Sequence, residues 1–157
     1  EILEDLPEVD AIIAPLGGGG LLAGIAAAVR PARPSTRIYA AEPETASPLA
    51  ASIEAGRAVT FDRWQASFVD GAGGKSVLAS MWPLLSPLSG SIVVTLDEVA
   101  RAIRLVAERA HVIAEGAAGC AVAAATTGRA GKGKVVAVVS GGNIDLARFL
   151  SLVRTAP

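Results

Sequence analysis

The stretch that decides the fold is Ala11-Ile12-Ile13-Ala14-Pro15-Leu16, followed directly by Gly17-Gly18-Gly19-Gly20. The short apolar run is typical of a strand that is buried on both faces, as in parallel sheets. The residues after the glycines predict a helix over 21–30 whose apolar side chains share one face: Leu21, Leu22, Ile25 and Val29. Strand, glycine loop and helix together predict the start of an α/β unit.

Two prolines, Pro31 and Pro34, predict the end of this helix, and residues 37–41 predict a second strand. The two strands and their helix therefore predict a right-handed crossover unit. A capping box at Thr95–Glu98 predicts a helix with an apolar face from Val99 to Ile113. The other predicted elements are helices over 47–55, 75–85, 117–127 and 145–153, and strands over 91–95 and 134–139, the last one buried.

Composition restricts the class of protein. The 157 residues carry 14 Lys+Arg against 15 Asp+Glu, and 52% of them are hydrophobic. So apolar a chain of this length predicts one folded domain, and the lack of basic excess argues against nucleic-acid binding. A single cysteine, Cys120, excludes a disulfide within the chain and predicts a buried thiol. We expect a cytoplasmic α/β enzyme without a signal peptide or membrane span.

The glycine loop at 17–20 predicts an anion site, because bare N–H groups at a helix N-terminus favour phosphate. A tight turn without a ligand is the alternative. Gly18-x-Gly20-x-x-Ala23 also satisfies the dinucleotide fingerprint, with Glu42 at the position of a ribose-binding acid. Gly74-Lys75-Ser76 is similar to the end of a P-loop, but Val69 stands where that motif requires a glycine.

A third glycine loop, Ser140-Gly141-Gly142-Asn143, follows the last predicted strand. With the Gly17–Gly20 tetrad and Glu115-Gly116-Ala117-Ala118-Gly119, it makes the chain resemble the C-terminal half of a fold-type II pyridoxal-phosphate enzyme. The resemblance is to the serine/threonine dehydratase and serine racemase group. It also covers Ala41-Glu42-Pro43-Glu44 and Asp70-Gly71, almost from end to end of the chain.

The resemblance implies a three-layer α/β fold, with a mainly parallel sheet and helices on both faces, similar to the large domain of the tryptophan synthase β chain. It implies one cofactor-binding unit over residues 1–157, belonging to a longer protein. It also implies that pyridoxal phosphate is held by the following residues: Gly17, Gly18, Gly19, Gly20, Leu21, Gly71, Glu115 and Ser140. The tetrad would hold the phosphate, and Gly71 would lie beside the ring.

In this resemblance Ser140 contacts the pyridine nitrogen and Glu115 is a carboxylate near the cofactor. A hydroxyl, unlike a carboxylate, does not form an ion pair with a pyridinium, so it leaves the ring largely neutral. A neutral ring is a weaker electron sink, which favours expulsion of a β-substituent over a long-lived carbanion. The alternative for Glu115 is an ordinary acid at a helix end.

Members of the group with a divalent-cation site use the glutamate of Glu-Pro, a backbone carbonyl four residues later and an acid six residues later. These positions are Glu42, Ala46 and Pro48 here. Because Pro48 has no side-chain oxygen, Glu42 and Ala46 predict at most a weakly held ion. Hydrogen bonds to Glu42 are the alternative.

The lysine that forms the Schiff base in this group lies in a Ser-x-Lys-x-Arg type motif. Lys75, Lys132 and Lys134 match no such motif and are predicted to be surface charges. We therefore expect this half alone to lack turnover and to aggregate. His111, predicted to lie in the amphipathic helix, has no partner motif for acid–base work.

The resemblance implies a lyase that converts serine, threonine or a related β-hydroxy amino acid to a 2-oxo acid and ammonia. A racemase of the serine racemase type is the nearest alternative. A nicotinamide-binding Rossmann domain and a phosphate-binding module without catalysis are the alternatives from other classes. The expected partners are an amino-acid substrate and further copies of the protein, in a dimer or tetramer, with no nucleic acid or membrane.

Overall fold

The computed structural model describes residues 1–155, without the side chain of residue 155. Within them, four parallel strands form one sheet in the order β3-β2-β1-β4. The strands are β1 (Ala11–Pro15), β2 (Arg37–Pro43), β3 (Gly90–Val94) and β4 (Val135–Ala137). The helices are α1 (Ile2–Asp5), α2 (Gly20–Ala32), α3 (Pro48–Ala55), α4 (Trp82–Leu85), α5 (Leu96–Ala110), α6 (Gly116–Thr126) and α7 (Leu146–Thr155). None of the helices in this part of the chain is long and apolar enough to cross a membrane.

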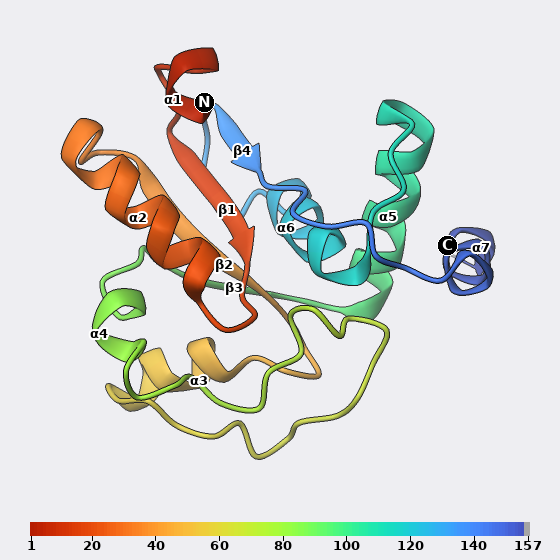
Figure 1. Ribbon diagram of the computed structural model, residues 1–157, viewed down its shortest axis with the longest axis horizontal. Coiled ribbons are helices and arrows are strands. Elements are labelled where there is room, and N and C mark those ends of the chain that lie inside the picture. The colour runs from red at the N-terminus through yellow and green to blue at the C-terminus, as the bar shows by residue number, and fades with distance from the viewer. Residues whose placement is uncertain (156–157) are drawn as a thin grey trace.

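The two faces of the sheet carry separate apolar clusters. All five residues of β1 are buried, and alternate side chains point to opposite faces. Ile12 and Ala14 pack with α2, whereas Ala11 and Ile13 pack with α5 and α6. Helices therefore cover both faces, as Figure 1 shows, and the expected three-layer α/β fold is confirmed.

The register of the sheet brings the first and third glycine loops to one edge. Pro15 at the end of β1 pairs with Ala41 of β2, and Ile13 pairs with Ala137 of β4. The Val138 N–H then donates to the Ile13 carbonyl, at 2.9 Å. The loops that follow β1 and β4 thus both leave the carboxyl edge of parallel strands, where ligands bind in this architecture.

The β1–α2–β2 unit is confirmed, with two differences in its helix. Pro31 lies inside the last turn and does not end α2, which continues to Ala32. This position is tolerated because few helical hydrogen bonds remain to be lost, and Arg33 N–H still reaches the Val29 carbonyl at 2.7 Å. Leu21 is 43% exposed, so it does not belong to the buried face.

The helix predicted over residues 75–85 is mostly absent, because only Trp82–Leu85 is helical. Lys75 and Ser76 instead pair with an earlier segment. The Phe61 N–H donates to the Lys75 carbonyl at 2.7 Å, and Thr60 forms a bridge with Ser76. The segment between these pairs is a long irregular loop that reaches the carboxyl edge of the sheet (Figure 1).

Two further predictions were wrong at their ends. Helix α5 ends at Ala110, and His111 lies after it in the left-handed region with φ 56°, so Ile113 is 51% exposed. Strand β4 covers only 135–137 and is half-buried, where a buried strand over 134–139 was predicted. The reason is that β4 has a single neighbour, β1, in this part of the chain.

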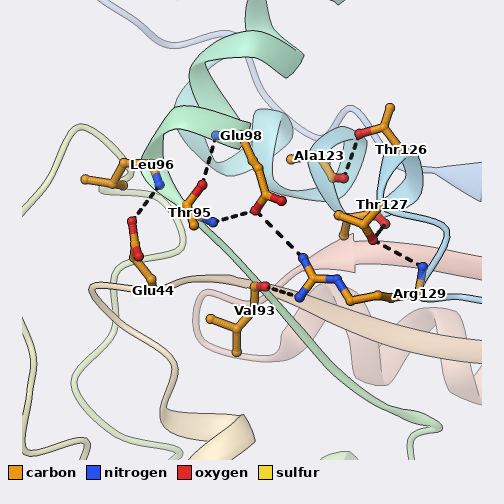
Figure 2. A network of polar contacts seen from close by, with 10 residues as sticks. Glu44, Val93, Thr95, Leu96, Glu98, Ala123, Thr126, Thr127 and Arg129 are labelled. Atoms are coloured by element: carbon orange, nitrogen blue, oxygen red, sulfur yellow. Dashed lines mark hydrogen bonds and ion pairs between the residues drawn. The ribbon is translucent and has the colours of Figure 1, made fainter. Parts of the chain in front are cut away.

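The capping box at the start of α5 is confirmed and belongs to a larger network (Figure 2). The Glu98 N–H donates to Thr95 Oγ1 at 3.1 Å, and the Thr95 N–H donates to Glu98 Oε2 at 2.7 Å. Arg129, just after α6, donates to the Val93 carbonyl at 2.6 Å. These bonds join the end of β3 to the start of α5 and the end of α6.

Candidate cofactor site

The first part of the site is the turn from β1 into α2. Gly19 is the N-cap of α2 with φ 92°, a conformation that L-residues with a Cβ rarely adopt. The first turn of α2 contains no acidic residue, and no side chain caps it. The first N–H groups of a helix have no helical acceptor, so they remain available to an anion.

The turn has the shape that a phosphate requires. A Cβ added to Gly18 or Gly20 would meet no heavy atom within 4 Å, so the space in front of this backbone is open. On the other side the packing is tight: a Cβ on Gly17 would lie 2.7 Å from the Gly71 carbonyl oxygen. The residues present therefore fit a phosphate bound by backbone N–H groups.

The second part is the segment that carries Gly71. A Cβ on Gly71 would lie 3.1 Å from both Glu115 Oε1 and Ala117 Cβ. Gly71 thus lies between the glycine turn and the start of α6. The segment is fixed from outside by Trp64, whose ring N–H donates to the Gly73 carbonyl at 2.8 Å. Sequence reasoning missed Trp64, because nothing in the local sequence links it to a glycine nine positions later.

The third part is the loop after β4, which Glu115 holds in two places. The Glu115 N–H donates to the Gly141 carbonyl at 3.1 Å, and its carboxylate accepts from the Asn143 N–H at 3.0 Å. Glu115 is the N-cap of α6, but its side chain makes no capping bond to that helix. The Glu115 carboxylate therefore contacts the Ser140–Asn143 loop and not its own helix.

Contacts from Gly17 to Gly71, from Gly71 to Glu115 and from Glu115 to Gly141 join the three loops. Ser140, the first residue of the third loop, is exposed. A cavity of about 180 Å³ opens beside Glu115, and its lining includes Phe68, Asp70, Asn143 and Arg148. Pockets that hold a whole ligand start at roughly 300 Å³, so this cavity is too small for one, and its lining does not include Gly17–Gly20, Gly71 or Ser140. Arg148 was not foreseen, because it comes from α7.

Not all predicted site residues lie in this group. Leu21 is the second residue of α2, and its side chain is partly exposed to solvent. Glu42 is fully buried and accepts hydrogen bonds from the N–H groups of Leu49 and Ala50 in α3, at 2.8 and 2.9 Å. Burial raises the pKa of Glu42, and its hydrogen bonds oppose the shift. Its carboxylate is therefore occupied, which removes the acid that the dinucleotide interpretation needs for a ribose.

The other titratable candidates have contacts of their own. Lys75 is exposed, with Nζ 4.3 Å from the centroid of the Trp64 ring, and Lys134 pairs with Glu8 at 2.5 Å. Cys120 is fully buried in α6, as predicted, and burial raises the pKa of its thiol to about 12. Within residues 1–155, no three His, Cys, Asp or Glu side chains are placed to hold a metal ion together.

The structure thus has a three-layer α/β fold in which a glycine turn with free helix N–H groups and two further loops lie at one sheet edge, the place where cofactors bind in this architecture. Comparison with known proteins gives the family. The family model described as pyridoxal-phosphate dependent enzyme matches residues 1–141. The chain belongs to this family, whose cofactor is pyridoxal phosphate. This assignment decides against the nicotinamide-binding alternative.

Curated relatives agree with this assignment. The chain is 36% identical over 153 residues to the catabolic L-threonine dehydratase of Escherichia coli strain K12, covering 94% of this chain and 46% of the relative. It is 36% identical over 162 residues to human serine racemase, covering 99% of this chain and 47% of the relative. The chain thus spans about half the length of the relatives that it matches.

Among solved structures, maize serine racemase matches with a TM-score of 0.86 and 33% identity, over 96% of this chain and 47% of that one. A fungal L-serine ammonia-lyase from Rhizomucor miehei matches with a TM-score of 0.84 and 25% identity, over 99% of this chain and 53% of that one. The fold-type II resemblance inferred from the glycine loops is confirmed.

Proposed function

We propose that the protein containing this chain is a pyridoxal-phosphate-dependent lyase that removes water from serine, threonine or a related β-hydroxy amino acid. The enamine that remains is then hydrolysed, which consumes one water and gives a 2-oxo acid and ammonia. The observation that carries the proposal is the junction of three loops at one sheet edge, joined through Gly17, Gly71 and Glu115. Its relatives include a threonine dehydratase and a serine ammonia-lyase.

Each loop has a separate role in this proposal. The backbone N–H groups of residues 17–21 bind the phosphate, with the positive end of α2 behind them. When bound, pyridoxal phosphate withdraws electrons from the Cα of the amino acid attached to it. The Ser140 hydroxyl donates a hydrogen bond to the ring nitrogen, which needs no proton of its own to accept it. As a neutral donor, Ser140 would leave the ring nitrogen unprotonated, which would favour loss of the β-hydroxyl.

Glu115 acts on the Ser140–Asn143 loop in this proposal. By accepting from Asn143 N–H and donating its own N–H to Gly141, it fixes the loop directly after Ser140. Gly71 has no Cβ, so the backbone of its segment can approach both Glu115 and the flat face of a ring. These residues orient the cofactor, and the lysine that moves the Cα proton belongs to the rest of the protein.

Racemisation is the second candidate, because human serine racemase is as similar to this chain as the E. coli dehydratase, at 36% identity each. The test uses the whole protein that contains this chain, purified with pyridoxal phosphate and given L-serine, L-threonine and D-serine separately. Formation of 2-oxo acid and ammonia in equal amounts is expected. Release of the opposite enantiomer without 2-oxo acid would favour the racemase, and failure to bind the cofactor would refute both.

We also propose that residues 1–157 form one cofactor-binding unit and that the whole protein is a dimer or tetramer. Light scattering coupled to size-exclusion chromatography measures the oligomeric state directly. A monomer that retains full activity would overturn it.

A further inference from the structure

The Glu42-Pro43-Glu44 segment at the end of β2 brings two carboxylates to the ends of two helices. Glu42 accepts from the Leu49 and Ala50 N–H groups in the first turn of α3, at 2.8 and 2.9 Å. Glu44 accepts from the Leu96 N–H at the first residue of α5, at 2.9 Å (Figure 2). Each acid therefore faces the positive end of a helix dipole, an arrangement that stabilises a carboxylate.

A third donor, from strand β3, contacts the Glu42 carboxylate. The Ser91 hydroxyl of β3 donates to Glu42 Oε2 at 2.5 Å, so three protein donors occupy the two carboxylate oxygens. Glu42 has no exposed surface, and Ala46 is 1% exposed. Three elements, β2, β3 and α3, meet at this one side chain.

Members of the family with a divalent-cation site would place the ion here, and the residues do not fit one. Mg²⁺ and Ca²⁺ take six or more oxygen ligands, mainly from carboxylates, carbonyls and water. The first acid of the set is occupied by N–H and O–H donors, and the third position is Pro48, which lies at the start of α3. The neighbouring acid, Glu44, is engaged at α5.

We infer that the N-terminal N–H groups of α3, and not a metal ion, are the partners of the Glu42 carboxylate in this protein. The end of β2 is then held to α3 and β3 without a cation. Helix α3 replaces the ion because its first turn points bare N–H groups at the carboxylate. This inference concerns how the sheet edge is held together and does not depend on the reaction proposed above.

The test measures thermal unfolding of the whole protein without added cofactor, in EDTA and then in millimolar Mg²⁺, Ca²⁺ or Mn²⁺. We expect the midpoint to be the same in all four conditions. A saturable increase with any of these ions that Glu42→Gln removes would overturn the inference. Since the readout is unfolding of the cofactor-free protein, failure of the proposed lyase activity would leave this result unaffected.

Substitutions show whether Glu42 acts as inferred. Glu42→Gln places an amide donor against protein donors, so its midpoint should fall by about 4 °C or more, equally in EDTA and in Mg²⁺. If Glu42→Gln does not fold, Ser91→Ala is used in its place. It removes only one donor to Glu42 and should lower the midpoint less, again by the same amount with and without cation. The matched control is Glu54→Gln, an exposed acid on α3, which should leave the midpoint unchanged. A Ser91→Ala protein that becomes dependent on cation would also overturn the inference.

Discussion

Two glycine loops lie at the same edge of the sheet, and they are held in place differently. The turn at Gly17–Gly20 follows β1, which is buried along its whole length between two neighbouring strands. The loop at 140–143 follows β4, a half-buried strand with one neighbouring strand among residues 1–155. The first is defined by its own backbone, including the left-handed Gly19, and the second by one side chain, Glu115. The first loop should thus be sensitive to an added Cβ, and the second to the loss of a carboxylate.

The largest effect is expected from Gly19→Val. At φ 92° a β-branched residue is strained, and a Cβ there would lie 2.9 Å from Leu85 Cδ1. We expect a loss of about 2–4 kcal/mol in the free energy of unfolding and almost complete loss of bound pyridoxal phosphate. Urea denaturation and cofactor absorbance measure the two effects. Gly24→Ala, inside α2 and outside the glycine turn, is the matched control, because its Cβ meets no heavy atom within 4 Å and its φ is ordinary. Normal cofactor content in Gly19→Val would contradict the phosphate role of this turn.

The second loop is tested by Glu115→Gln. The amide of glutamine is uncharged and has one oxygen, so its hydrogen bond with the Asn143 N–H is weaker. We expect the free energy for local opening of the 140–143 loop to fall by about 1.5–3 kcal/mol. Hydrogen exchange should become faster at residues 141–143 and stay unchanged at 17–20. Glu108→Gln is the control, because Glu108 is exposed on α5 and pairs with Arg104 away from the loop. Equal acceleration at both glycine loops would show that the two are not held separately.

Ser140→Ala should have a smaller effect than either. One neutral hydrogen bond contributes about 1 kcal/mol, so cofactor affinity should fall by a factor of roughly five. Ser140→Asp should instead favour a protonated ring and change the absorption spectrum. Ser86→Ala, at an exposed serine after α4, is the control. If neither change at residue 140 alters the spectrum of the bound cofactor, Ser140 does not face the ring nitrogen.

The smallest effect concerns Cys120 in α6, the helix that begins directly after Glu115 and packs against one face of the sheet. Burial, followed by the charge of Glu42, raises the pKa of this thiol to about 12. The thiol should therefore stay protonated and unreactive toward a disulfide reagent at pH 8 in the native protein. In urea it should react at once, which serves as the control. Rapid labelling of Cys120 in the native protein would mean that α6 opens easily and is not a rigid support for the loop residues packed against it.

Local sequence could predict the loops at 17–20 and 140–143 because each follows its strand within a few residues. β1, the glycine turn and α2 follow one another without interruption, and so do Thr95, Glu98 and the face of α5 that begins at Val99. The order of the glycine motifs was enough to indicate the family. In the strand–turn–helix unit and in the capping box, the deciding interactions join residues within a few positions of one another.

Other features were decided by contacts between distant parts of the chain. Glu42 fitted a ribose-binding acid or a metal ligand by its position, yet the N–H groups of α3 and the Ser91 hydroxyl use its oxygens. Residues 75–76 pair with Thr60 and Phe61, which prevents the helix that their own spacing predicts. Trp64 holds Gly73 across a loop that has no periodic pattern.

The sequence by itself determined the strand–glycine–helix unit, the capped helix and the identity of the loops, because backbone conformation and burial patterns depend on neighbouring residues. Only the tertiary structure decided that Glu115 connects the second and third loops, that β4 is a short edge strand and that Glu42 is closed off by a helix end. These outcomes depend on which elements lie side by side in the sheet. A hydrogen-bond partner or a neighbouring strand that is tens of residues distant in the sequence cannot be predicted from the local sequence pattern.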